Sequence, residues 1–225
     1  MYTIAPRVMN DLVIFGAGGY GREVRQVVED VNADRSTWNL LGFLDDDPAN
    51  HGGALLDLPV LGGAGWLEAH PAVAVVVAAG SPASRWKMLR ALEPREHPVL
   101  VHPRAWIANH VTIGRGTVVL AGAAISTEVS IGEFVCLNKN CIAGHEGVVG
   151  DFVTVSPGAS LSGRVHIGTG CDIGANSVVV QGVRVGEWSV VGAGGVVPRD
   201  LPPNVTAVGV PVKVIKERPA GWYDS

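Results

Sequence analysis

The chain has 225 residues and a formal charge of −4, from 17 Lys and Arg against 21 Asp and Glu, which is enough for one long domain or two small ones. It has no strongly basic block and no apolar run of about 18 residues, which argues against nucleic-acid binding and against a membrane span. Residues 1–11 also lack the pattern of a signal peptide, so we expect a soluble, cytoplasmic protein.

The first hundred residues alternate short apolar strands with helical patterns. Strands are expected at 12–15, 40–44, 73–79 and 98–101, and helices at about 22–32 and 83–92. A loop is expected over 48–65 and a single helical turn over 66–70. This alternation predicts a βαβαβ unit with a parallel sheet, which is half of a Rossmann fold, over residues 1–101.

A glycine-rich turn, Gly16-x-Gly18-x-x-Gly21, separates the first predicted strand from the first predicted helix. Glycines allow close backbone approach to a phosphate, and the N-terminus of a helix attracts one. Asp45 ends the next strand, where its carboxylate could bond a ribose hydroxyl. Half a Rossmann fold suits a single nucleoside diphosphate better than a dinucleotide. The alternative is that the glycines only pack the helix on the strand.

A six-residue repeat runs from Ile107 to Val197, and fifteen of its sixteen first positions are Ile, Leu or Val. Helices repeat at 3.6 residues and strands at two, so this period predicts a solenoid in which three hexads make one turn. The second residue of a hexad is often Gly or Ser, which we expect to let the backbone turn each corner. Cys141 and Cys171 fall at inward-facing positions and are predicted to be small core residues.

Beyond Val197 the repeat stops. Residues 200–211 are rich in proline and are expected to cover the open end of the solenoid, and the last dozen residues are expected to be partly disordered. The predicted boundaries are therefore 102–215 for the repeat domain with its cap and 216–225 for a tail.

The hexad 143–148 is the weakest repeat, because Ala143 replaces the aliphatic residue and Gly147 the usual fifth residue. A local departure from the pattern marks a candidate functional site. His145 is third in this hexad and should point outward, and an exposed imidazole beside the Glu146 carboxylate is a candidate general base. The alternative is a surface histidine without a role. No pair of histidines or cysteines has metal-ligand spacing, so we expect no catalytic metal.

The hexads resemble those of acyltransferases with a left-handed parallel β-helix. The whole chain is similar to one bacterial subfamily, the N-acetyltransferases of nucleotide-linked amino sugars with the related sialic acid O-acetyltransferases. Three stretches carry this resemblance: the Gly-rich turn with Phe43-Leu44-Asp45-Asp46, the segment 142–146 followed by 155–159, and the closing Val208-Gly209-Val210-Pro211.

The resemblance implies a homotrimer that binds acetyl-CoA between neighbouring β-helices and transfers the acetyl group to the sugar amine, in surface glycan synthesis. By the family pattern, nucleotide-sugar contacts would come from Gly18, Gly19, Tyr20, Asp45, Asp46 and Gly80. Contacts with acetyl-CoA would come from Thr154, Gly163, Ala175, Ala193 and Lys213, with the Gly163 N–H at the thioester carbonyl. His145 would be the base and Glu146 its support.

Three other functions stay open on the sequence alone. The first is O-acetylation of sialic acid or of another sugar hydroxyl. The second is a non-catalytic protein that binds a nucleotide sugar, against which the His145–Glu146 pair argues. The third is an NAD-dependent oxidoreductase, against which the short N-terminal domain argues.

Overall fold

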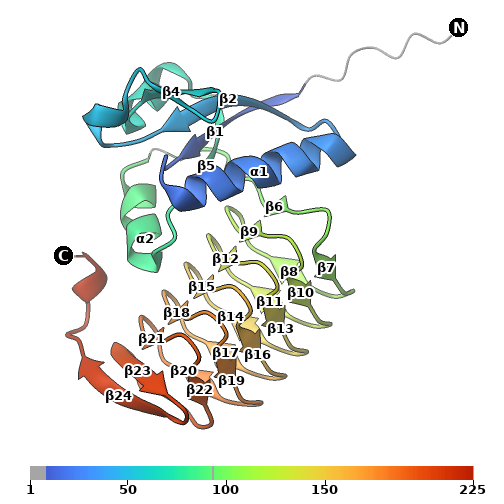
Figure 1. Ribbon diagram of the computed structural model, residues 1–225, viewed down its shortest axis with the longest axis vertical. Coiled ribbons are helices and arrows are strands. Elements are labelled where there is room, and N and C mark those ends of the chain that lie inside the picture. The colour runs from blue at the N-terminus through green and yellow to red at the C-terminus, as the bar shows by residue number, and fades with distance from the viewer. Residues whose placement is uncertain (1–8, 93, 225) are drawn as a thin grey trace, which may run out of the picture.

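The computed structural model describes residues 9–92 and 94–224, and within them an α/β domain sits on top of a parallel β-helix (Figure 1). The α/β domain has a sheet in the order β3-β4-β2-β1-β5, which is parallel except for the antiparallel β3–β4 pair. Its elements are β1 Asn10–Phe15, α1 Gly19–Asp34, β2 Trp38–Leu44, η1 Pro48–Asn50, β3 Ala54–Leu55, β4 Leu58–Gly62, η2 Ala64–Ala69, β5 Ala74–Val77 and α2 Pro82–Arg90.

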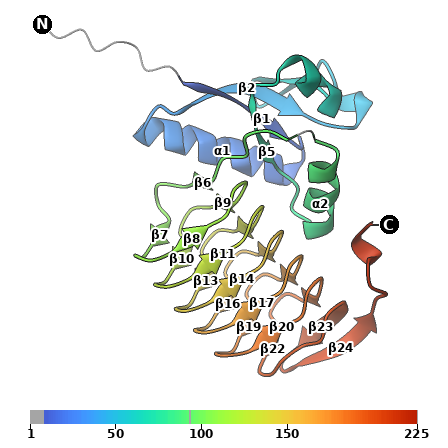
Figure 2. The same cartoon turned by 180° about the vertical axis from the view of Figure 1, so that it is seen from behind.

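Helix α1 joins the two domains. Val24, Val27 and Val28 lie on one face of it at helical spacing and are buried. They belong to a core cluster that also contains Leu12 and Ile14 of β1, and Val118, Leu120 and Cys136 of the β-helix. Both views show α1 lying between the sheet and the first coils of the β-helix (Figures 1 and 2). The domains therefore share apolar core rather than meeting through a flexible linker.

The structure corrects three parts of the predicted α/β domain. The segment 48–65, predicted to be a loop, contains η1, β3 and β4. The helical turn predicted over 66–70 is the longer 3-10 helix η2. The last predicted strand is β6, Leu100–Val101, and it pairs with the β-helix strand β9 instead of the N-terminal sheet. Val101 lies six residues before Ile107, so the hexad period itself extends back to this strand and sets its register.

The β-helix has three faces, each a ladder of two-residue parallel strands. Face 1 contains β6, β9, β12, β15, β18 and β21; face 2 contains β7, β10, β13, β16, β19 and β22; face 3 contains β8, β11, β14, β17 and β20. The strands are β7 Trp106–Ile107, β8 Thr112–Ile113, β9 Val118–Val119, β10 Ala124–Ile125, β11 Ser130–Ile131, β12 Cys136–Leu137, β13 Ile142–Ala143, β14 Val148–Val149, β15 Thr154–Val155, β16 Ser160–Leu161, β17 His166–Ile167, β18 Asp172–Ile173, β19 Val178–Val179, β20 Arg184–Val185, β21 Val190–Val191 and β22 Val196–Val197.

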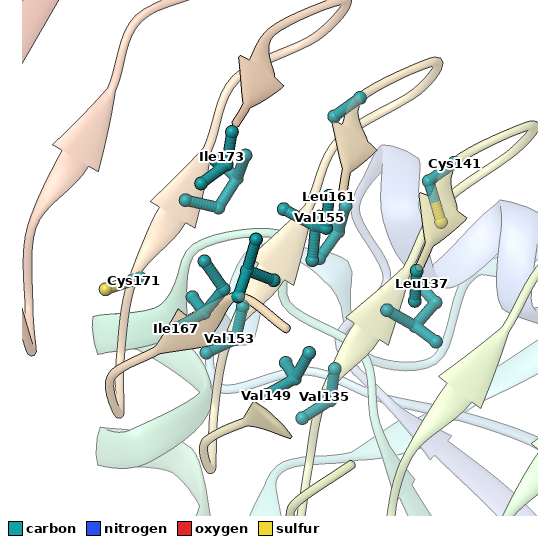
Figure 3. Packing of buried hydrophobic residues seen from close by; sticks show 14 of the residues in the cluster. Val135, Leu137, Cys141, Val149, Val153, Val155, Leu161, Ile167, Cys171 and Ile173 are labelled. Carbon is teal, nitrogen blue, oxygen red and sulfur yellow. The ribbon is translucent and has the colours of Figure 1, made fainter. Parts of the chain in front are cut away.

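The first residue of each hexad fills the interior of the β-helix, as the period predicts. Figure 3 shows Leu137, Val155 and Ile173 stacked on one side of this core, with Leu161 and Ile167 on the others. Cys141 and Cys171 are buried in the same cluster, which confirms them as small core residues, and burial raises the pKa of each thiol to about 12.

The role predicted for the second position of the hexad needs correction. The residue that turns each corner is the fourth of the hexad, which has a positive φ whether it is Gly158, Asn140 or Phe152. Glycines at the second position instead make room for the next coil. A Cβ on Gly150 would lie 2.8 Å from the backbone N of Thr169, and one on Gly174 would lie 2.6 Å from that of Ala193.

The C-terminal segment is more ordered than its polar sequence suggests. Strand β23, Val205–Gly209, pairs with β21, and β24, Val212–Glu217, pairs antiparallel with β23. The 3-10 helix η3, Trp222–Asp224, then packs against α2: the Asp224 carboxylate accepts from Trp86 Nε1 and from Arg90. Tyr223 stacks on Trp188 of the β-helix. The expectation of a partly disordered last dozen residues is therefore wrong for the part that the structure describes.

Candidate active site

The Gly-rich turn contains four glycines, and they fall into two groups by the space around them. A Cβ on Gly16 would lie 2.6 Å from the carbonyl oxygen of Ala78, and one on Gly21 would overlap the carbonyl oxygen of Gly16, so these two are needed for packing. Gly18 and Gly19 have open space around them and lie at the start of α1. Packing alone therefore explains Gly16 and Gly21, and it leaves the exposed backbone of Gly18 and Gly19 available to a phosphate.

Asp45 ties the end of β2 to the Gly-rich turn. One carboxylate oxygen accepts from the backbone N–H of Ala17 at 2.9 Å, and the other accepts from Asp47 N–H at 3.0 Å and from Asn50. Partial burial alone would raise the pKa of Asp45, but these hydrogen bonds hold it below its ordinary value. Asp46 lies beside it and accepts from Ala64 N–H at 3.3 Å. Both carboxylates thus stand at the carboxyl edge of the parallel sheet, as predicted.

The ring of Tyr20, which was predicted to contact the nucleotide sugar, packs inside the protein. It packs against the core cluster that joins α1 to the β-helix. Burial, followed by the neighbouring Cys136, raises the pKa of its phenol well above the ordinary value. The ring therefore anchors the start of α1 on strand β12.

Arg85 of α2 is a central residue of this region that sequence reasoning missed. It is 2% exposed and donates to the carbonyl oxygens of Ala79 and Gly80 on one side and to those of Phe134, Phe152 and Val153 on the other. One arginine therefore clamps the loop after β5 to the β-helix. A single Arg inside a helical pattern gives no signal of this role.

Thr154 belongs to the same clamp. Its hydroxyl donates to the Gly80 carbonyl at 2.8 Å and accepts from Arg85 Nη2 at 2.9 Å, and the residue is 6% exposed. The hydroxyl that the resemblance assigns to the acetyl thioester is thus engaged between the two domains. Gly80 itself is exposed, and a Cβ at this position would meet no atom within 4 Å.

His145 lies at the corner between faces 2 and 3, and it points outward as its place in the hexad predicts. Its side chain is 46% exposed, and Nδ1 lies 2.9 Å from Oε2 of Glu146. When Nδ1–H donates to this carboxylate, Nε2 is left as an unprotonated acceptor. This is the arrangement that a general base requires, with Glu146 orienting the ring.

Gly163 lies directly below His145 on the next coil. A Cβ at this position would overlap the imidazole, so only glycine leaves room for the ring. The carbonyl oxygen of Gly163 accepts from Gly182 N–H in the ladder between coils. Its own N–H donates to no acceptor among residues 9–92 and 94–224. The geometry thus places a free backbone donor beside the candidate base.

The remaining predicted residues lie on a different corner, between faces 1 and 2. Ala175 and Ala193 are stacked there, with the Gly194 N–H donating to the Ala175 carbonyl at 2.8 Å. Lys213 follows Val212, which packs beside Gly195 at the same end of this corner. Ala193 and Lys213 are exposed.

A single chain therefore keeps the parts of the predicted site apart. The Gly-rich turn lies over face 1 and the Arg85 clamp lies at the corner between faces 3 and 1, whereas His145 lies at the corner between faces 2 and 3. No group of three or more His, Cys, Asp or Glu side chains in the described part of the chain is placed to hold a metal ion. Within those residues there is also no helix long and apolar enough to cross a membrane.

Comparison with known proteins covers both halves of the molecule. Residues 11–92 match the PglD N-terminal domain family. The chain is 31% identical to the GDP-perosamine N-acetyltransferase of Escherichia coli over 226 residues, which span 94% of this chain and 99% of that protein. Among solved structures it is similar to PerB from Caulobacter crescentus in complex with CoA and GDP-perosamine, with 30% identity, a TM-score of 0.82, and 93% and 99% of the two chains covered. The acetyltransferase domain of PglB from Neisseria gonorrhoeae has 32% identity and a TM-score of 0.83, with 92% and 100% covered.

Proposed function

The chain belongs to the family of GDP-perosamine N-acetyltransferase, and we propose that it transfers an acetyl group from acetyl-CoA to the amine of a nucleotide-linked sugar with His145 as the general base. The observation that carries the role of His145 is its outward imidazole, with Nδ1 on Glu146 and Nε2 above Gly163. The similarity over nearly the whole chain favours an amine acceptor over a sialic acid hydroxyl, and a catalyst over a non-catalytic binder.

The reaction needs only positioning and one proton transfer. The neutral amine attacks the thioester carbon while His145 Nε2 takes the proton that the nitrogen must lose. The Gly163 N–H donates to the oxyanion of the tetrahedral intermediate. Its collapse releases CoA, whose sulfur receives the proton from the imidazolium that Glu146 supports. The general base contributes roughly 10²–10⁴-fold to the rate.

A second copy of the chain is needed to complete this site, which supports a homotrimer. His145 and Gly163 flank face 2 on one side, and Ala175 and Ala193 flank it on the other. The outer ladder of face 2 is largely apolar, running from Trp106 to Val196, and Trp106 is 60% exposed. Packing three such faces around an axis parallel to the β-helix buries this surface. It also places the His145 corner of one copy beside the Ala175 corner of the next, with acetyl-CoA between them.

The acceptor would be bound by the N-terminal domain. The open backbone of Gly18 and Gly19 suits a phosphate of the nucleotide, and Asp45 and Asp46 stand at the sheet edge where a ribose or base would lie. Acetyl-CoA and nucleotide sugars are both cytoplasmic metabolites, which supports a cytoplasmic enzyme of surface glycan synthesis.

The deciding experiment measures CoA-thiol release from acetyl-CoA against GDP-perosamine and a panel of other nucleotide-linked 4-amino and 3-amino sugars, with sialic acid as a further acceptor. Release with one amino sugar, lost in His145→Ala, establishes the N-acetyltransferase and names its acceptor. Release with sialic acid alone would replace it by O-acetylation. Silence with every acceptor, although acetyl-CoA binds, would contradict the proposal.

A further inference from the structure

The corner that carries His145 also carries a column of charged side chains. Glu128, Glu146 and Arg164 follow each other at intervals of eighteen residues, so they lie on three successive coils between faces 2 and 3. All three are the fourth residue of their hexads and share a positive φ, of 60°, 57° and 57°. The Glu146 N–H donates to the carbonyl oxygen of Thr127, which fixes the register of the upper two coils. The three side chains therefore leave the β-helix in the same direction, one above the other.

Glu146 lies between a like charge and an opposite charge. Its Oε2 is 2.9 Å from Nδ1 of His145 and 3.9 Å from Nη1 of Arg164. At 3.9 Å the guanidinium acts on the carboxylate through its charge rather than through a hydrogen bond. Glu128, one coil above, forms no ion pair within the described part of the chain, so its charge is left to repel Glu146.

A contribution to stability alone is a poor account of Arg164. Its side chain and that of Glu146 are 56% and 47% exposed, and an exposed ion pair adds little to folding. The pair Arg115–Glu133 has the same eighteen-residue spacing and similar exposure, but it lies at the other end of face 3, between faces 3 and 1. What distinguishes Glu146 from Glu133 is that its carboxylate also contacts His145. The charge of Arg164 therefore bears on the ring of the proposed base.

The backbone gives Arg164 a second link to the same coil. Its N–H donates to the carbonyl oxygen of His145 at 2.8 Å. Arg164 also follows Gly163 directly, and Gly163 leaves the space that the imidazole occupies. The root of the Arg164 side chain is thus held at a fixed place beside His145 and Glu146.

We propose that Arg164 is a positioning residue of the acetyl transfer, whose charge holds the Glu146 carboxylate on His145 Nδ1 against the repulsion from Glu128. This inference rests on the proposed function and adds a third residue to the pair that prepares the base. With Oε2 on Nδ1–H, the imidazole keeps Nε2 as the atom that takes the proton of the amine. Without Arg164 the carboxylate turns away from the ring more often. The ring then carries its proton on Nε2 for part of the time, and in that form Nε2 takes no proton.

The test is a double-mutant cycle in kcat, measured by CoA-thiol release with the acceptor that the wild type uses. Arg164→Gln should lower kcat by about two- to fivefold, the size of an exposed ion pair, and leave the KM of both substrates unchanged. Arg164→Lys keeps the charge and should retain most of the wild-type kcat. In Glu146→Gln the carboxylate is already gone, so adding Arg164→Gln should cause no further loss. Arg115→Gln breaks the matched pair at the other end of face 3 and should leave kcat unchanged.

Two further measurements examine the repulsion and the ring itself. Adding Glu128→Gln to Arg164→Gln should restore kcat, since it removes the repulsion that Arg164 opposes. The position of the His145 proton gives a readout that needs no substrate. In ¹⁵N NMR of histidine-labelled protein, with the His145 signals assigned by their loss in His145→Ala, the wild type should show the Nδ1–H tautomer. Arg164→Gln should show a mixture of the two tautomers.

The contrary outcomes separate this inference from the proposed function. Wild-type kcat and an unchanged tautomer in Arg164→Gln would overturn it. An equal fold-loss in the Glu146→Gln background would show that Arg164 acts independently of the carboxylate, and a raised KM for acetyl-CoA with unchanged kcat would make it a substrate contact. Each of these results overturns the positioning role although the wild type acetylates an amino sugar. If the wild type releases no CoA with any acceptor, the proposed function fails, and the tautomer in Arg164→Gln still decides whether Arg164 holds the ring through Glu146.

Discussion

The β-helix and the α/β domain bring distant residues together by different rules. In the β-helix a residue pairs with the one eighteen positions later at every rung, from Leu100 with Val118 to Val179 with Val197. In the α/β domain no such interval exists: β1 pairs with both β2 and β5, and Ala17 donates to Asp45 across 28 residues. The period of a repeat therefore predicts tertiary contacts, whereas an α/β domain must be folded before its contacts are known.

The largest effect on activity is expected from a substitution in hexad 143–148, where the repeat pattern fails. Replacing His145 by alanine removes the proposed general base but leaves the interior of the β-helix intact, because the side chain points outward. We expect kcat to fall by roughly 10²–10⁴-fold, with unchanged oligomeric state and CoA affinity. Steady-state kinetics with sedimentation analysis check this, and near-normal kcat would refute the assignment.

Gly163 lies eighteen residues after His145, on the next coil, and Gly163→Ala tests whether the space at this position holds the imidazole in place. The new Cβ overlaps the imidazole from the coil below and should displace it, which we expect to lower kcat by about 10²-fold. The double variant with His145→Ala is the control, since the Cβ then has room. It should be no slower than His145→Ala alone, and a further loss would show that Gly163 acts independently of the ring.

Arg85→Met tests how much the Arg85 hydrogen bonds contribute to the attachment of the α/β domain to the β-helix. The change removes the hydrogen bonds of Arg85 to five backbone carbonyls and to the Thr154 hydroxyl. The carbonyls of Gly80 and Val153 keep a second donor, whereas those of Ala79, Phe134 and Phe152 lose the one donor that they have among the described residues. We expect this to cost about 2–4 kcal/mol of unfolding free energy. We expect the α/β domain to unfold before the β-helix, as two transitions in denaturant followed by tryptophan fluorescence. Thr154→Val, which removes only one member, should cost less. A single unshifted transition in Arg85→Met would contradict the clamp.

Substitutions at two glycines of the β-helix compare the stability cost of a clash between coils with that of a positive φ at a corner. Gly174→Ala puts a Cβ against the next coil and should cost about 1–3 kcal/mol. Gly182→Ala has open space, but its φ is +76°, so it should cost only about 1 kcal/mol from backbone strain. Thermal unfolding measures the loss of melting temperature in each variant, and we expect the larger loss in Gly174→Ala. A larger loss in Gly182→Ala would show that the coils adjust to a new side chain more easily than the turns do.

The smallest effect concerns the link between the Gly-rich turn and β2. The folded-state pKa of Asp45 is lowered, so its contribution to stability is present above the ordinary pKa of about 3.9 and is lost as the pH falls through the folded value. We expect the melting temperature of the wild type to drop more steeply below about pH 4 than that of Asp45→Asn. Parallel slopes for the two proteins would contradict this role of the carboxylate.

Much of the site could be found from local sequence. The hexad period predicted the β-helix, and its failure at 143–148 marked His145 and Glu146, because a repeat shows its own exceptions. The Gly-rich turn between a strand and a helix marked Gly18 and Gly19, although only the packing showed that Gly16 and Gly21 serve the fold. The family resemblance added Gly163, and the structure gives its reason in the space that the imidazole occupies.

Other features depend on contacts that no short stretch of sequence encodes. Arg85 is one arginine in an ordinary helical pattern, and it becomes a clamp only because α2 lies against the corner between faces 3 and 1 of the β-helix. The same docking turns Thr154 into an interdomain residue and brings Lys139 to Glu23. By itself the sequence determined the repeat, the Gly-rich turn and the candidate base, since each follows from a local period or spacing. Only the tertiary structure decided where the domains meet and that His145 and the Gly-rich turn lie on opposite sides of one chain. Both depend on packing between segments with no common period.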